Sequence, residues 1–270
     1  MNDLFSVKDS VILLTGGYGI LGTCMAKHLA KEGAKVVILG RNPQKGEALA
    51  KEIQSAGGEA LFLQADVLDR DSLMACREQI MARYGQINVL VNLAGGNQVG
   101  ATIPPGKTFF DLDVSAFRGV VDLNLFGTVI PTMVFAEVMV QQGKGSIINI
   151  SSESALRPLT RVVGYGCAKA AINNFTQYLA GELAIKFGEG LRVNAMAPGF
   201  FLTDQNRALM SNPDGTPTDR CNTIVAHTPF RRLGKPEELL GTLQWLASDA
   251  SAFVTGTVIP IDGGFDAFSI

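Results

Sequence analysis

Histidine and cysteine are scarce in this 270-residue chain, which has two histidines and four cysteines. The cysteines lie more than 50 residues apart, and none forms a Cys-x-x-Cys pair or stands beside a histidine. Zinc sites and disulfide frameworks need such clusters. We therefore expect no metal site and no disulfide. The residues concerned are His28, His227, Cys24, Cys76, Cys167 and Cys221.

The sequence also lacks an excess of positive charge, with 23 Lys and Arg against 25 Asp and Glu and a net charge of -2. This balance gives no broad attraction to phosphate backbones, so nucleic acid is not an expected partner. The first residues contain no basic segment followed by an apolar one, and no uninterrupted apolar run of about 18 residues occurs. We expect no membrane partner and a cytoplasmic location.

The chain does contain short β-branched runs that alternate with longer amphipathic stretches. This pattern predicts βαβ units and an α/β fold, a Rossmann-type doubly wound parallel sheet. Runs such as 36–39 are apolar at successive positions, which is typical of strands covered on both faces. The predicted strands are 11–15, 35–39, 60–64, 89–92, 146–151, 192–197 and 258–261.

No repeat or linker divides the sequence, so residues 1–270 are expected to form a single domain. One irregular region, about 200–233, contains the turn formers Asn212-Pro213-Asp214-Gly215 between two predicted strands. Long irregular insertions at such places are usually functional. We expect this segment to be a lid over a substrate.

A glycine-rich turn, Thr-Gly-Gly-Tyr-Gly-Ile-Leu-Gly, follows the first predicted strand and leads into a predicted helix over 23–32. Its glycines allow a tight turn and close approach to a pyrophosphate, while the helix N-terminus supplies free N–H groups. The turn predicts a dinucleotide site; the alternative is a turn needed for packing only. The expected contacts are Gly16, Tyr18, Gly19, Ile20 and Gly22.

The residues after the second strand bear on which dinucleotide binds. NAD sites place a carboxylate there for the ribose 2′-hydroxyl, but this chain has Arg41, which suits a 2′-phosphate. NADP is therefore favoured over NAD, unless Arg41 is a solvated loop residue. Asp66, with Val67 beside it, is expected at the adenine; the alternative for Asp66 is a helix N-cap.

Tyr165 and Lys169 open a predicted helix over 165–186, and their spacing of four places them on one face. An ammonium near a phenol lowers the phenol pKa from about 10. Ser152 lies 13 residues before the tyrosine, at the carboxyl end of a strand, where ligands bind in open α/β sheets. Together they predict proton exchange with an alcohol or ketone. A lone Tyr-x-x-x-Lys is more often an exposed helix pair.

With these motifs in order, the sequence resembles the short-chain dehydrogenase/reductase family over essentially its whole length. The resemblance implies that Tyr165 is the general acid/base, that Lys169 binds the nicotinamide ribose and lowers the tyrosine pKa, and that Ser152 orients the carbonyl. It also implies that Asn124 anchors a water for proton relay. Residues implied to line the cofactor are Asn92, Ala94, Gly95, Pro198, Gly199 and Thr203.

Simpler roles exist for some of these residues. Asn92 and Asn124 satisfy backbone groups in one alternative, and Pro198-Gly199 is then an ordinary turn. The glycine turn also departs from the family, with glycines at its second, fifth and eighth positions rather than its second, sixth and eighth. We expect this departure to alter pyrophosphate contacts and not the class of cofactor.

Arginines flank the predicted catalytic residues. Arg157 and Arg161 lie between the serine and the tyrosine, and arginine binds a carboxylate with two parallel hydrogen bonds. An anionic substrate is therefore expected, with Asn97 contributing an amide for sugar hydroxyls. The alternative is that the arginines face water or pair with glutamates.

Stretches at 95–97, 157–161 and 260–265 resemble the D-mannonate oxidoreductase (fructuronate reductase) branch of the family. This resemblance implies NAD(P)-dependent interconversion of D-fructuronate and D-mannonate in sugar acid metabolism. A gluconate or polyol dehydrogenase and a 3-oxoacyl-carrier-protein reductase are alternatives. A non-catalytic NADP-binding regulatory protein is disfavoured because serine, tyrosine and lysine are all present.

Family members are commonly homotetramers, which makes a homo-oligomer the expectation from the resemblance. The predicted long helix over 115–142 suits pairing with its copy in another subunit. An amphipathic helix packs equally well inside a monomer.

Overall fold

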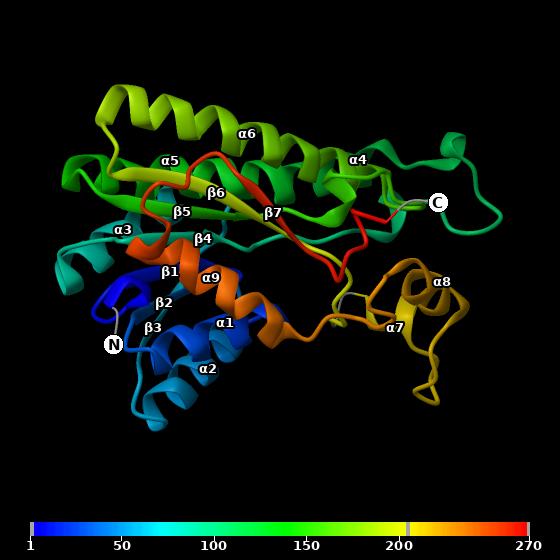
Figure 1. Cartoon of the computed structure of the whole chain (residues 1–270), viewed down its shortest axis with the longest axis horizontal. Helices are drawn as coiled ribbons and strands as arrows, with labels where there is room; N and C mark the ends of the chain where they lie inside the picture. The colour runs from blue at the N-terminus through cyan, green and yellow to red at the C-terminus, as the bar shows by residue number, and fades with distance from the viewer. Residues whose placement is uncertain (1–2, 204–205, 269–270) are drawn as a thin grey trace.

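Seven parallel strands form one sheet in the order β3-β2-β1-β4-β5-β6-β7 (Figure 1). This computed structural model describes residues 3–203 and 206–268, so positions 204 and 205 of the predicted lid lie outside the described residues. The prediction of a Rossmann-type sheet is confirmed. The strands are β1 Val11–Thr15, β2 Lys35–Gly40, β3 Glu59–Gln64, β4 Val89–Asn92, β5 Gly145–Ile150, β6 Leu191–Pro198 and β7 Val258–Ile261.

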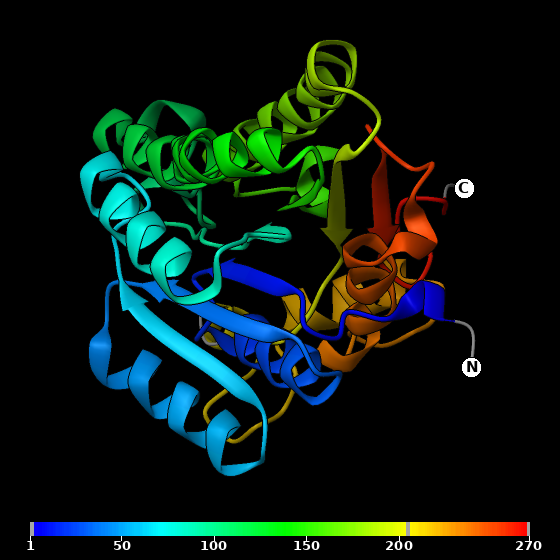
Figure 2. The ribbon, with the colours of Figure 1, turned by 90° about the vertical axis from the view of Figure 1, so that its left-hand side faces the viewer.

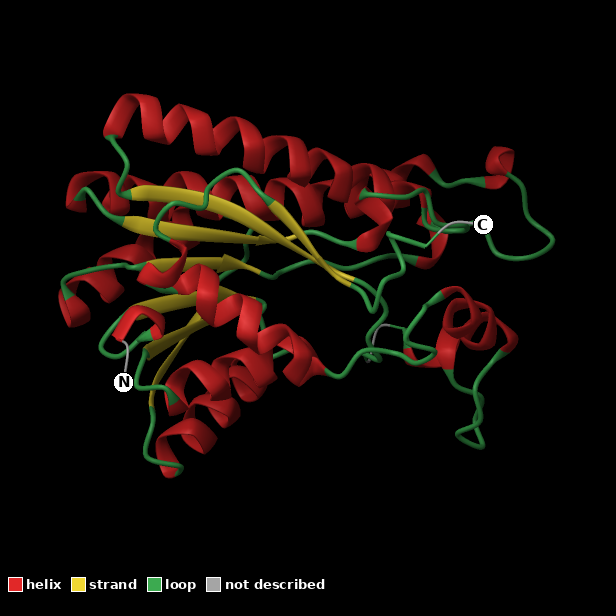
Figure 3. Cartoon of the chain, viewed as in Figure 1, coloured by secondary structure: helices red, strands yellow, loops and turns green. Residues whose placement is uncertain are grey.

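Helices cover both faces of the sheet (Figure 2). On one face lie α1 Ile20–Lys31, α2 Pro43–Ser55 and α9 Leu240–Ala247, and on the other α3 Arg70–Tyr84, α5 Gly127–Gln142 and α6 Val163–Phe187. The short helices are α4 Val114–Val121, α7 Arg207–Met210 and α8 Asp219–His227. The longer loops lie beyond the carboxyl ends of the strands, as Figure 3 shows, and so do α7 and α8.

The two faces of β1 explain its unbroken apolar sequence. Ile12 and Leu14 pack into the cluster formed with α1, α2 and α9, while Val11 and Leu13 pack into the cluster formed with α3, α5 and α6. All four side chains are fully buried. Successive side chains of a strand point to opposite faces, so a strand between two helical layers needs apolar residues at every position.

The predicted helix over 115–142 is interrupted in the structure. A π-helical turn, Asp122–Phe126, separates α4 from α5 and contains the buried Asn124. Such turns insert a residue into the helical repeat and are frequent at functional sites. By length and a mean hydropathy of 1.6, the stretch Val114–Gln142 is apolar enough to cross a membrane, but 56% of the most apolar window is buried inside the protein. It is consistent with a core helix.

The observed bounds of the other elements differ from the predicted bounds by a few residues. Helix α1 begins at Ile20 rather than at residue 23, and β5 ends at Ile150, so Ser151 follows the strand. The backbone of Ser151 still donates to the Met196 carbonyl at 2.7 Å. Helix ends and strand ends depend on local hydrogen bonds that residue pattern does not record.

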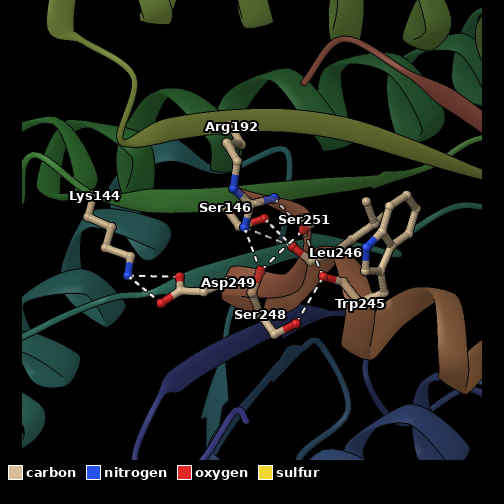
Figure 4. Close-up of polar contacts among 8 residues, drawn as sticks. All are labelled: Lys144, Ser146, Arg192, Trp245, Leu246, Ser248, Asp249 and Ser251. Carbon is tan, nitrogen blue, oxygen red and sulfur yellow. Dashed lines mark hydrogen bonds and ion pairs between the residues drawn. The ribbon is translucent and has the colours of Figure 1, made fainter. Parts of the chain in front are cut away.

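A buried arginine holds the C-terminal end of α9 against the sheet (Figure 4). Arg192, on β6, is 8% exposed and donates to the carbonyls of Leu246 and Ser248, both at 3.1 Å, and to the Ser251 hydroxyl at 2.7 Å. The last carbonyls of a helix lack partners within the helix. Burial lowers the pKa of Arg192, and these acceptors supply its hydrogen bonds.

We predict that Arg192→Met lowers the free energy of unfolding by about 2 to 4 kcal/mol, because it removes three hydrogen bonds from a buried polar network, although Ser146 and Ser251 still donate to the Leu246 and Ser248 carbonyls. The measurement is chemical denaturation followed by circular dichroism. Lys144→Met is the matched control, since the ion pair of Lys144 with Asp249 is exposed and should contribute at most about 1 kcal/mol. Equal losses in the two variants would contradict the prediction.

Candidate active site

The glycine turn after β1 has two kinds of glycine. Gly16 has a φ of +65°, and a Cβ there would lie 3.0 Å from the Ala94 Cα; a Cβ on Gly22 would lie 2.7 Å from the backbone of Gly17. These two glycines are required by the protein's own packing. Around Gly19 the nearest atom to such a Cβ is 3.6 Å away. Glycine at 19 instead leaves open the surface in front of α1.

Helix α1 begins without a side-chain cap. Gly19, its N-cap residue, has extended backbone and offers no side chain for the first N–H groups. Unpaired N–H groups and the positive end of the helix dipole attract anions. The open surface at Gly19 and the uncapped helix therefore fit the pyrophosphate of a dinucleotide. The packing-only alternative accounts for Gly16 and Gly22 but not for Gly19.

The loop after β4 packs beside this turn. The Thr15 hydroxyl accepts hydrogen bonds from the backbone N–H groups of Leu93 and Ala94, both at 3.1 Å. A Cβ on Gly95 would lie 2.7 Å from Asn124 Oδ1. The predicted residues Ala94 and Gly95 are thus held between the glycine turn and the π-helical turn.

Tyr18 packs over Gly40 at the end of β2. This is next to the position where NAD sites have a carboxylate and this chain has Arg41. A Cβ on Gly40 would lie 2.3 Å from the Tyr18 ring, and the Tyr18 hydroxyl accepts from Asn42 N at 2.9 Å. Arg41 is largely exposed and lies 3.9 Å from an Asp66 carboxylate oxygen. The structure brings the predicted Tyr18, Arg41 and Asp66 to the same edge.

Asp66 does not cap the following helix. Its carboxylate accepts from Leu68 N at 3.0 Å, whereas Asp69 caps α3 by accepting from the N–H groups of Asp71 and Ser72. The N-cap alternative for Asp66 is therefore wrong by three residues. Val67 is buried, and its side chain packs against Gly127 at the start of α5.

Lys169 and Tyr165 lie together at the N-terminal end of α6. Lys169 is only 3% exposed; its ammonium donates to the Ile150 carbonyl at 2.7 Å and lies 5.5 Å from the centre of the Tyr165 ring. The carbonyl belongs to the last residue of β5, two residues before Ser152. The Ser152 hydroxyl accepts from Ser154 N and from the Ser154 hydroxyl, at 3.2 and 3.1 Å.

Burial governs the protonation of the pair. It raises the pKa of Tyr165, while a hydrogen bond with Ser152 lowers it, and it lowers the pKa of Lys169 to about 7. From the sequence we expected the Lys169 ammonium to lower the pKa of Tyr165. In the structure, burial raises that pKa. The Tyr165 phenol is consequently protonated at neutral pH and suited to donate a proton.

Asn124 is held by the backbone on both sides of the site. Its amide donates to the carbonyls of Gly96 and Val120, at 2.6 and 2.8 Å, and its oxygen accepts from Gly96 N at 3.2 Å. The alternative that Asn124 satisfies backbone groups therefore describes its contacts in this structure. The water-anchoring role stays a prediction.

Asn92, by contrast, forms part of a buried polar chain beneath the site. Its amide donates to the Thr132 hydroxyl and to Asn149 Oδ1, at 2.8 and 2.9 Å, and Asn149 donates to Thr176 at 2.9 Å. These contacts join β4 and β5 to α5 and α6. The side chain of Asn92 therefore has a structural role here, although its partners are side chains and not the backbone groups that its alternative named, and a cofactor contact of this residue stays a prediction.

The remaining predicted cofactor residues follow β6. Pro198 ends the strand, and Gly199 donates to the Ile261 carbonyl at 3.0 Å, with room for no side chain because a Cβ would lie 2.7 Å from Asp262 Cα. Thr203 N donates to Asn206 at 2.8 Å. This turn starts the segment 200–233.

The three predicted substrate residues have different contacts. Arg157 donates to the Asp266 carboxylate at 2.9 Å and also to the carbonyl of Asp266, so it ties the C-terminal segment to the loop after β5. Asn97 accepts from Gln98 N at 2.9 Å. Arg161 is half-buried, and no ion pair joins it to a carboxylate of residues 3–203 or 206–268.

Glu153 was missed by the sequence argument. It follows Ser152, is 1% exposed, and neither carboxylate oxygen has a hydrogen-bond partner among the described residues. Burial, then the charges of Asp262 and Asp266, raise its pKa to about 7. The only available signal was a glutamate directly after a buried strand and a catalytic serine, which does not reveal burial.

The amino-acid sequence matches a known protein family over most of the chain. A sequence profile of the short chain dehydrogenases matches residues 10–214. The chain belongs to the short-chain dehydrogenase/reductase family. It is therefore an oxidoreductase acting on CH–OH and C=O groups, its fold binds NAD(P), and its substrates are small molecules. The predicted enzyme class is confirmed.

Three similar proteins illustrate the relationship. The uncharacterized oxidoreductase UxuB of Bacillus subtilis (strain 168) is 48% identical over 274 residues, covering 98% of this chain and 97% of the relative. A structure of a proposed D-mannonate oxidoreductase from Haemophilus influenza with bound NAD has a TM-score of 0.91 at 43% identity, covering 98% and 97%. A gluconate 5-dehydrogenase from Burkholderia cenocepacia J2315 with NADP and tartrate has a TM-score of 0.89 at 30% identity, covering 99% of each chain.

We predict that Tyr165→Phe lowers the turnover of this dehydrogenase by about a hundredfold or more, because the proton donor is removed. NAD(P)H binding, measured by fluorescence titration, should be retained. Tyr84→Phe is the control, since Tyr84 ends α3 before the start of β4 and therefore lies away from the carboxyl ends of the strands. Near-full turnover of the Tyr165 variant would refute its role as acid.

We also predict a pH effect on stability. Because the folded protein raises the pKa of Glu153 from 4.5 to about 7, folding favours the protonated carboxyl, and stability is lost as pH rises through that range. Glu153→Gln should show a smaller fall in Tm between pH 5 and pH 8 than wild type. Glu52→Gln, at an exposed position, serves as control. Equal pH profiles in wild type and Glu153→Gln would contradict this origin.

Proposed function

We propose that this dehydrogenase interconverts the ketone of a six-carbon sugar acid and its secondary alcohol, with D-fructuronate and D-mannonate as the pair. The observation that carries this proposal is a candidate catalytic serine, tyrosine and lysine whose connecting loop bears Arg161, which no carboxylate of the described residues pairs with, whereas Arg157 of the same loop pairs with Asp266. Two of the similar structures are named as enzymes of sugar acids. One is the proposed D-mannonate oxidoreductase and the other is the gluconate 5-dehydrogenase.

The chain's own residues would divide the chemistry as follows. The bound nicotinamide supplies or accepts the hydride. The Ser152 hydroxyl hydrogen-bonds the substrate oxygen and holds it near the Tyr165 phenol, which donates its proton on reduction and takes it back on oxidation. Lys169, fixed by the Ile150 carbonyl, places a positive charge beside the phenolate left after proton transfer. Asn124 would anchor the water through which the proton is replaced.

The segment 200–233 would act as the lid of this site. Its apolar residues Met210, Cys221 and Ile224 form a small cluster of their own, separate from the two clusters that flank the sheet. Elements held by few contacts with the main core move at low energetic cost. The lid and the remaining chain would constitute one domain over residues 1–270.

A homo-oligomer remains part of the proposal, with the tetramer that the family resemblance implies. Apolar side chains on the outer surfaces of α5 and α6 are exposed, namely Met133 at 60%, Tyr178 at 66% and Ile185 at 87%. Exposed apolar patches commonly mark interaction sites. We also propose a cytoplasmic location, which the four free cysteines support.

For the cofactor, we predict that Arg41→Asp shifts the preference from NADPH toward NADH. Arg41 is exposed and only weakly engaged by Asp66, so its guanidinium is available for a 2′-phosphate, and aspartate would repel that phosphate. The ratio of kcat/KM with NADPH to kcat/KM with NADH should fall by about tenfold or more. Lys8→Asp, at an exposed position before β1, tests the effect of charge alone. An unchanged ratio would exclude Arg41 as the selecting residue.

The substrate is tested by following NAD(P)H absorbance with a panel of carbonyl compounds. D-fructuronate should be reduced with a higher kcat/KM than 5-ketogluconate, uncharged ketoses and a 3-oxoacyl thioester. A higher value for 5-ketogluconate or an uncharged ketose would favour a gluconate or polyol dehydrogenase, and a higher value for the thioester would favour an acyl reductase. Either result would reject the fructuronate assignment while leaving the catalytic residues in place.

A further inference from the structure

A contact between α8 and the catalytic loop joins the segment 200–233 to the active site. Arg220, in the first turn of α8, donates to the hydroxyl and to the carbonyl of Thr160, both at 3.2 Å. Thr160 lies on the loop between Ser152 and Tyr165. The proposed lid therefore places an arginine side chain on the loop that carries the catalytic groups.

The next residue of that loop, Arg161, has an unusual backbone. Its φ is +77°, in the left-handed region where glycine and asparagine are common and other residues are disfavoured. Its carbonyl accepts from Ile103 N at 3.0 Å, which fixes the conformation. Residues in such sparsely populated conformations are enriched at functional sites, and Asp9 and Arg231 also have positive φ. The loop thus keeps an arginine where its backbone favours a smaller residue.

The positive charges of Arg161 and Arg220 lie close enough to act on each other. Among the described residues, no ion pair joins either of them to a carboxylate, whereas neighbouring Arg157 pairs with Asp266 and Arg232 of the lid pairs with Glu238. Burial first, and then the positive charge of Arg161, lower the pKa of Arg220. Two half-buried cations that repel each other form a site that a bound anion would stabilise.

We propose that Arg161 and Arg220 together bind the carboxylate of the substrate, and that this carboxylate holds the lid against the catalytic loop. The proposal rests on the sugar-acid function. One arginine comes from the loop and one from the proposed lid, so a bound carboxylate would add a further link to the hydrogen bonds that already join Arg220 to Thr160. A carboxylate has two oxygens and accepts from both guanidinium groups at once. Selectivity for the acid and closure of the lid then have the same cause.

The test compares Arg161→Met, Arg220→Met and the double variant on D-fructuronate and on an uncharged ketose of similar length. Each single variant should lose about tenfold or more in kcat/KM for the acid and change little for the ketose. Because both arginines bind one group, the double variant should lose less than the product of the two single losses. Arg232→Met, whose arginine pairs with Glu238, is the control and should leave the acid-to-ketose ratio unchanged.

A binding measurement separates this proposal from the function on which it rests. D-mannonate should raise the Tm of the wild-type protein in the presence of cofactor, and the rise should be lost in Arg161→Met and in Arg220→Met. If wild type binds D-mannonate but does not reduce D-fructuronate, the proposed function fails and loss of binding in the variants still supports the site. Equal losses on acid and ketose, or unchanged stabilisation in both variants, would overturn the two-arginine site.

Discussion

The hydrogen bond from the Lys169 ammonium to the Ile150 carbonyl joins the catalytic helix to the end of β5, and the geometry of the site depends on it. It fixes a buried amine at the start of α6, and Tyr165 then lies one turn away on the same face. It also fixes the end of the strand two residues before Ser152. The active site is therefore set by the contact of one helix with one strand, which the parallel sheet keeps rigid.

Burial sets the protonation of the polar groups in this site, and it also lowers the stability of the fold there. It keeps the Tyr165 phenol protonated and lowers the pKa of Lys169, so that a proton donor stands beside an amine that readily gains or loses charge. The same burial leaves the Glu153 carboxylate, beside Ser152, without a hydrogen-bond partner among the residues that the structure describes. Active sites often contain groups that destabilise the fold, because the shape required for catalysis fixes their surroundings.

Local sequence patterns predicted the strands well and the polar contacts poorly. The predicted bounds of β1, β4 and β7 agree with the structure because buried parallel strands are short apolar runs between turn formers. The π-helical turn at Asn124 was not predicted, since its helical neighbours have ordinary helical sequences. Arg157 was expected at the substrate and contacts Asp266, a residue 109 positions away. Contacts across such separations leave no local signal.

The sequence by itself determined the fold class and the oxidoreductase family, and it singled out the glycine turn and Ser152, Tyr165 and Lys169 as candidate site residues, because each is a short pattern with a physical requirement at fixed spacing. Tertiary structure alone decided which arginines pair with a carboxylate and which carboxylate is buried. The reason is that charge and burial are properties of the space around a side chain. Arg161 and Arg220 lie 59 positions apart in the chain and come near each other only because α8 contacts the loop between Ser152 and Tyr165.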